Sequence, residues 1–392
     1  MRIGDEQRRA RLGRRHHLAT ETKARDVVDV ARDLVGLHAT DPASVFLAAA
    51  ARMKVPSIAA TEEALYVERS LVRVLGMRRT LFVEPVELLP IVYASTTGAV
   101  AARNRAAIEK DVVLHGVGDD GAAWLRAVEE QTMAALVARG EATGNQLSSD
   151  VPLLRTQVRY GEGKAWEGLQ GMTTRVLTQL GADGRIVRGR PRGVWSSTQY
   201  QWTPMATWLG ADLPVMAVDE AQVELVRRWL ATFGPATVAD VKWWTGWGAA
   251  EVKRALAAIQ PVEVELDDGS VGLVLADDTA PVRAPRPWAA LLPALDPTAM
   301  GWTGRAWYLG PHAASLFDRS GNIGPTVWWC GRIVGGWGQR PSGEVVVRLL
   351  EDIGADATVA VMAEAARLTA FLGGTRISPR FRTPLERELA GG

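Results

Sequence analysis

Three polar side chains, His38, Thr40 and Asp41, lie close together in an otherwise apolar stretch of the chain. An imidazole titrates near neutral pH and can act as a general base, and a hydroxyl can hold a water molecule. A carboxylate can stabilise a positive charge that develops in a transition state. Structural roles are the alternatives: a buried hydrogen bond for His38, a helix-end hydroxyl for Thr40 and a helix cap for Asp41.

Two helices are expected to position these side chains. Apolar residues recur at helical spacing in Asp26–Leu37, and His38 continues the same face. Pro42 disfavours a helical conformation for Asp41, so we expect the first helix to stop near Thr40. Asp41 followed by Pro42 predicts an N-cap and first turn of a second helix, Pro42–Met53. His38 and Thr40 would then lie where one helix ends and the next begins.

The composition excludes several classes of protein. The chain has 392 residues, 47% of them hydrophobic and 23% charged, which is typical of a soluble protein of several domains. A single cysteine, Cys330, excludes internal disulfides and thiolate-rich zinc sites. The five histidines show no metal-binding spacing, so no metal and no cofactor is expected. Without a transmembrane run or a signal peptide, we expect a cytoplasmic protein.

Charge is distributed unevenly, although the net charge is only +1. Residues 1–25 are strongly basic and are expected to be flexible, and Arg185–Arg192 carries four arginines without an acid. Val262–Asp278 is acidic. Local basic patches suit a polyanion such as nucleic acid, whereas solvated surface is the simpler explanation for any one of them.

An order of helices followed by a β-hairpin occurs three times. The clearest case has helices at Glu220–Phe233, Val238–Thr245 and Ala249–Ile259 and a hairpin with an Asp-Gly turn after them. We therefore predict an α+β fold of three tandem winged-helix units at 1–119, 120–213 and 214–278. Residues 279–392 should form a β-barrel-like region with strands at 307–309, 326–329, 332–337 and 344–350 and a helix at 356–372.

Winged helices bind duplex DNA with one helix in a groove and the hairpin on the backbone. The first hairpin, Leu71–Val83, has a basic turn. The predicted DNA contacts are basic or amide side chains on hairpins: Arg78, Arg79, Arg188, Arg190, Arg192, Gln339 and Arg340. Trp243 and Trp244 are expected to fill the core of the third unit.

Several segments together resemble the AlkZ/YcaQ-like family of winged-helix DNA glycosylases. They are Leu34–Pro42, Met77–Leu81, Leu295–Trp302 and Gly321–Trp329. The resemblance extends over nearly the whole chain. It implies a C-shaped clamp around DNA and a Gln-x-Gln or Gln-x-Asp catalytic motif at the positions of His38 and Thr40, neither of which is a family residue here.

The function implied by the resemblance is hydrolysis of the N-glycosidic bond of bulky or crosslinked N7-alkylated guanine, as self-resistance to a genotoxic natural product. His38, Thr40 and Asp41 would then carry catalysis. The alternative is a non-enzymatic DNA-binding protein, either a regulator or a lesion binder. Three unlike units in one chain favour a monomer on alkylated duplex DNA, because a regulator usually reads a palindrome as a dimer.

Overall fold

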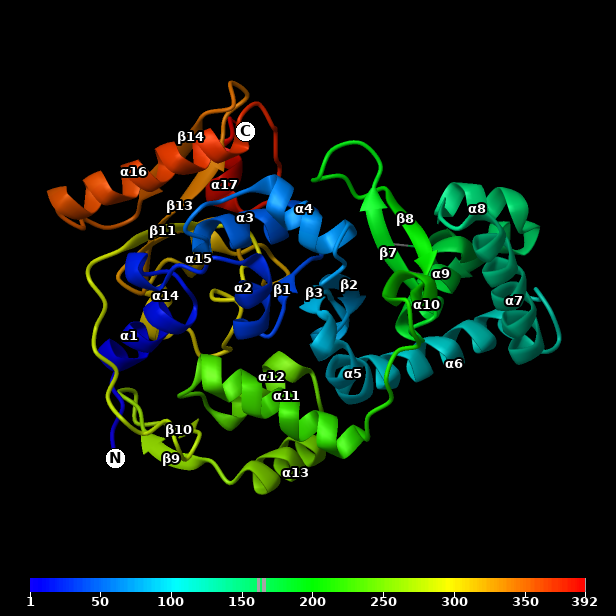
Figure 1. Ribbon diagram of the computed structural model, residues 1–392, viewed down its shortest axis with the longest axis horizontal. Coiled ribbons are helices and arrows are strands. Elements are labelled where there is room, and N and C mark those ends of the chain that lie inside the picture. Colours follow the sequence, from blue (N-terminus) through cyan, green and yellow to red (C-terminus); the bar gives the residue numbers. More distant parts are fainter. Residues whose placement is uncertain (161–162, 164–166, 392) are drawn as a thin grey trace.

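The computed structural model describes residues 1–160, 163 and 167–391 (Figure 1). Helices and small antiparallel sheets alternate along the chain, as an α+β class predicts. Within the described residues, no helix has both the length and the apolar character needed to span a lipid bilayer.

The basic N-terminal segment is ordered, contrary to our expectation. Helix α1 (Asp5–Arg15) lies beside the segment that leads out of the third predicted unit, where Arg11 and Arg15 both contact the Asp278 carboxylate. Arg2 pairs with Asp267 of the acidic hairpin. The basic charges of the N-terminus therefore neutralise acidic protein segments in the fold.

The first predicted unit contains a three-stranded sheet in the order β1-β3-β2. Its elements are α2 (Val27–Asp33), β1 (Leu37–His38), α3 (Pro42–Arg52), α4 (Ile58–Tyr66), β2 (Leu71–Leu75), β3 (Leu81–Pro85), α5 (Leu89–Val92) and α6 (Gly98–Leu114). The predicted Asp41 cap and Pro42 start of α3 are confirmed. Helix α4 begins after Ser57, whose side chain caps it by accepting a hydrogen bond from the Ala60 N–H.

The second predicted unit also combines helices with a three-stranded sheet, here β4-β8-β7. Its elements are α7 (Gly121–Arg139), β4 (Ala142–Thr143), α8 (Gly144–Asp150), β5 (Gln157–Tyr160), β6 (Gly168–Gly171), α9 (Met172–Ala182), β7 (Ile186–Pro191), β8 (Tyr200–Pro204) and α10 (Met205–Leu209). In Figure 1, α6 leads from the first unit to this group.

In the third predicted unit, the observed helices and hairpin agree most closely with those predicted from the sequence. Helices α11 (Val218–Phe233), α12 (Val238–Thr245) and α13 (Ala249–Ile259) precede a hairpin of β9 (Val262–Glu265) and β10 (Val271–Val274). Thr237 caps α12 through a capping box with Asp240, which explains why this boundary could be read from the sequence.

The C-terminal region contains an open four-stranded sheet, β11-β12-β13-β14, and not a closed barrel. In the described chain, β11 and β14 each pair with one neighbour, so the sheet keeps two edges. The elements are β11 (Ala289–Leu292), α14 (Ala306–Leu309), α15 (Ala313–Leu316), β12 (Thr326–Trp329), β13 (Arg332–Gln339), β14 (Val345–Leu349), α16 (Ala355–Leu372) and α17 (Pro384–Leu389). The strand expected at 307–309 is helical, because its three side chains pack into an aromatic core.

A buried ion pair joins the first unit to the C-terminal region. The Arg52 guanidinium on α3 binds both carboxylate oxygens of Asp296, at 2.8 and 2.6 Å, and also donates to the Thr298 hydroxyl. Both members of the pair are fully buried. Apolar residues of α3, the β1-β3-β2 sheet, β11 and α16 form one continuous core around this junction.

Candidate active site

His38 lies on a strand rather than at a helix end. Helix α2 ends at Asp33, and Val35 and Gly36 then adopt positive φ angles of 51° and 94°. A Cβ at position 36 would lie 2.2 Å from a carboxylate oxygen of Glu84, so only glycine fits there. The reversal lets His38 pair with Phe82 of β3. The expected continuation of the helix to Thr40 was therefore wrong.

The His38 imidazole is held as a neutral group. Its side chain is 5% exposed, its ring centroid lies 5.2 Å from that of Phe82, and Nδ1 is buried without a hydrogen-bond partner among the described residues. Burial and, to a smaller extent, the charge of Arg78 together lower the pKa of His38 to about 3. A neutral imidazole has one nitrogen that donates and one that accepts a hydrogen bond.

Thr40 and Asp41 extend from the same strand. The Thr40 hydroxyl accepts a long hydrogen bond, 3.4 Å, from the Leu81 N–H. The Asp41 carboxylate accepts from the N–H of Ala43 at 3.1 Å and from the N–H of Arg380 at 3.0 Å. Burial raises the pKa of Asp41, while these two N–H groups and the Arg380 charge act in the opposite direction. Asp41 thus caps α3 and also anchors the C-terminal loop.

Arg78 points away from a free hairpin tip and into the protein. Its guanidinium carbon lies 3.9 Å from the centroid of the Trp243 ring, and that of Arg305 lies 4.8 Å from the same ring. Burial lowers the pKa of Arg78 to about 10, and the like charge of Arg305 adds to this. Trp243 therefore holds Arg78, whose charge acts on His38, together with Arg305, and does not simply fill the core, as Trp244 does. Arg79 is exposed and donates to Asn104.

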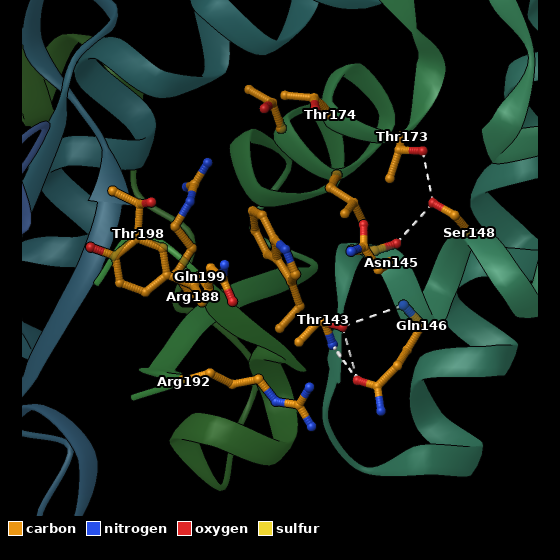
Figure 2. A pocket seen from close by; sticks show the side chains of 15 residues that line it. Thr143, Asn145, Gln146, Ser148, Thr173, Thr174, Arg188, Arg192, Thr198 and Gln199 are labelled. Carbon is orange, nitrogen blue, oxygen red and sulfur yellow. Dashed lines mark hydrogen bonds between the residues drawn. The ribbon is translucent and has the colours of Figure 1, made fainter. Parts of the chain in front are cut away.

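A second group of predicted site residues lines a cavity of about 500 Å³ in the second unit. Figure 2 shows hydroxyl and amide side chains of α8 and α9 opposite Arg188 and Arg192. The Arg188 guanidinium lies over the Trp202 ring at 4.4 Å, and burial with the nearby Arg73 charge lowers its pKa to about 10. Arg192 is exposed.

The remaining residues that were predicted to contact DNA differ in how far their side chains are free to bind it. Arg190 pairs with Glu62 at 3.2 Å and lies over the Tyr66 ring. Gln339 is 5% exposed, and its amide bonds to backbone groups of Gly343, Thr375 and Ile377.

The three hydrogen bonds of the Gln339 amide to backbone groups give this side chain a structural role, so we do not retain Gln339 as a DNA contact. Arg340 is exposed and pairs with Glu344. Across the described chain, no cluster of three or more His, Cys, Asp or Glu side chains could hold a metal ion.

Sequence reasoning missed Trp243, Arg305 and Arg380 as neighbours of the site. Each lies far along the chain from His38, and no local motif marks it. Arg380 reaches the site only because the loop after α16 folds back onto Asp41 and places its guanidinium 3.5 Å from the Thr40 carbonyl oxygen.

Comparison with known proteins assigns the chain to a family. Residues 31–371 match the AlkZ-like family of DNA glycosylases, which is most of the chain. The fold is similar to that of the DNA glycosylase AlkZ from Streptomyces sahachiroi, with a TM-score of 0.72 and 23% sequence identity. That similarity covers 97% of this chain and 100% of the AlkZ chain. A search of curated proteins finds no match. The chain belongs to the AlkZ-like DNA glycosylase family.

Proposed function

We propose that this chain is a monofunctional DNA glycosylase that releases bulky or crosslinked N7-alkylated guanine from duplex DNA, as self-resistance to a genotoxic natural product, and that it acts as a monomer. The observation that carries the proposal is a neutral, buried His38 beside Asp41, within a segment that matches the family and among several arginines.

Alkylation at N7 makes guanine cationic, so the glycosidic bond breaks without protonation of the base. The electrons of the C1′–N9 bond move to the purine and neutralise its charge, which leaves an oxocarbenium ion on the sugar. A water molecule must then add to C1′ and lose a proton. The protein has to position this water and stabilise the sugar cation.

His38 suits the first of these tasks. With a pKa of about 3 it is a weak base, so its role is to accept a hydrogen bond from the water and orient it, with Thr40 as a second polar contact. This changes our expectation that His38 itself takes the proton. Asp41 is the stronger base of the two, because burial raises its pKa, so we assign to its carboxylate both the proton that the water loses and the negative charge that stabilises the sugar cation.

A neutral His38 can then make the same hydrogen bonds as the glutamine that the family motif has at this position. A glutamine amide is neutral, donates through nitrogen and accepts through oxygen. A histidine that stays neutral throughout the physiological range offers the same pair of functions. We infer that burial and the Arg78 charge make His38 a substitute for the glutamine that the family resemblance places there.

Base release from duplex DNA that contains a defined N7-alkylguanine tests this proposal. His38→Gln should retain or raise activity. His38→Ala should lower it by about two orders of magnitude with nearly unchanged DNA affinity, because the water loses the contact that orients it. Thr40→Ala should cost less, because Thr40 is only the second polar contact of that water. Melting temperatures of the three variants control for unfolding.

A non-enzymatic DNA-binding protein, either a regulator or a lesion binder, is the alternative, and the substitution of both residues of the family motif is the observation that favours it. Binding of alkylated DNA without release of the base would decide for that alternative. A His38→Ala protein whose folded fraction keeps full activity would contradict the catalytic role of His38.

A further inference from the structure

A cavity of about 550 Å³ lies beside the candidate active site, and four of the nine residues that line it are arginines. Two segments far apart in the sequence form it: the turn after α15, with Phe317, Asp318 and Arg319, and the loop and helix that end the chain. The arginines that line it are Arg319, Arg380, Arg382 and Arg387.

The single acid on its wall does not neutralise these charges. The Asp318 carboxylate accepts hydrogen bonds from the N–H groups of Ser320 and Asn322 and from the Asn322 amide, all within its own turn. Burial acts to raise the pKa of Asp318, but the hydrogen bonds within the turn outweigh it and the pKa is lowered. Arg382 pairs with Glu386. In the part of the chain that the structure describes, the side chains of Arg319 and Arg387 are exposed and form neither an ion pair nor a hydrogen bond.

The cavity is physically connected to the site. The Arg380 N–H holds the Asp41 carboxylate, and the Arg380 side chain contacts the Thr40 carbonyl oxygen. On the other wall, the Phe317 ring lies under the guanidinium of Arg305, which shares Trp243 with Arg78. Arg78 beside His38 is therefore linked through Trp243 to Arg305, and Arg305 lies over the Phe317 ring that lines the cavity.

We propose that this cavity binds backbone phosphates of the DNA strand whose nucleotide enters the His38–Asp41 site. Exposed, uncompensated guanidinium groups match phosphate oxygens in charge and in hydrogen-bond geometry. Phosphates next to the reacting nucleotide fix its register, although they carry no sequence information. The inference rests on DNA as the substrate, but it does not require that base release occurs.

The test is equilibrium binding of an undamaged duplex by fluorescence anisotropy over a range of salt concentrations. The double variant Arg319→Gln/Arg387→Gln should reduce the slope of log K against log salt by about 1.8, because each lost phosphate contact contributes about 0.9. The same relation gives a loss of affinity of up to about 60-fold at 0.1 M salt. The double variant Arg319→Lys/Arg387→Lys should restore most of the slope, since lysine keeps the charge.

A matched control removes two exposed arginines elsewhere. Arg283 and Arg286 lie on the segment between β10 and β11, which runs past α1 in Figure 1. Arg283→Gln/Arg286→Gln should leave the slope unchanged, and both Gln double variants should keep the wild-type melting temperature. An unchanged slope for the cavity variant, or an equal fall in the control, would overturn the proposal. A wild-type protein that binds DNA with this slope but releases no base would contradict only the glycosylase function.

Discussion

The neutral state of His38 makes a measurable prediction about stability in acid. In the unfolded chain, an ordinary histidine has a pKa of about 6.5 and takes up a proton as the pH falls from 7 to 5. In the folded protein, the pKa of His38 is about 3, so the imidazole stays neutral in this range. The unfolded state therefore binds more protons, and the free energy of unfolding must fall as the pH falls.

The size of this effect follows from the two pKa values. From pH 6.5 to 5 the difference grows over about 1.5 pH units at about 1.4 kcal/mol per unit, so His38 should cost the protein about 2 kcal/mol of stability by pH 5. Glutamine has a neutral amide and does not titrate. The His38→Gln variant should therefore lose about 2 kcal/mol less stability than the wild type between pH 7 and pH 5.

Urea denaturation of both proteins at pH 7 and pH 5 measures the difference directly. The pKa of His16 is also strongly lowered, by burial and the Arg52 charge, but His16 is present in both proteins and its contribution cancels. The ratio of base-release rates of the two proteins should also stay constant from pH 5 to 8, since His38 remains neutral. Equal losses of stability, or a ratio that changes near pH 6.5, would refute the reasoning.

Two further predictions concern binding and folding. Arg192→Gln should lower the slope of log K against log salt for duplex binding by about 0.9. Arg190→Gln should lower this slope less, because Glu62 already pairs with Arg190. Equal changes of slope would contradict the assignment of Arg192 as the phosphate contact of this hairpin. Arg52→Met should reduce the free energy of unfolding by about 3–5 kcal/mol, because it leaves the Asp296 charge buried and unpaired. Adding Asp296→Asn should recover part of that loss in urea denaturation, and no recovery would exclude a charge effect.

The parts of the fold that sequence predicted are those fixed by local chemistry. Asp41-Pro42 specifies the start of α3, and Thr237 with Asp240 specifies the start of α12, because cap and first turn are adjacent in the chain. The helices of the third unit follow from apolar periodicity. Each of these signals depends on residues within one or two turns.

The parts that failed depend on contacts between distant segments. The helix before His38 ends early because Glu84 occupies the space beside Gly36 and because β1 pairs with β3. Residues 1–25, which contain α1, were expected to be flexible, because their partner Asp278 lies more than 250 residues further along the chain, at the end of the third unit. For the candidate site, the sequence indicated His38, Thr40, Asp41 and, as a DNA contact, Arg78. Arg305, just before α14, and Arg380, in the loop after α16, reach it only through the tertiary fold.

The Arg52–Asp296 pair has a consequence for the order in which parts of the protein can fold during synthesis. Asp296 leaves the ribosome long after α3, so during most of translation the Arg52 guanidinium has no carboxylate partner and its part of the core stays incomplete. In the same way, Arg11 of α1 is synthesised long before its partner Asp278, and Asp41 long before the Arg380 N–H that binds its carboxylate. From these long-range contacts we expect the first unit to reach its final packing only after the last segments of the chain have emerged.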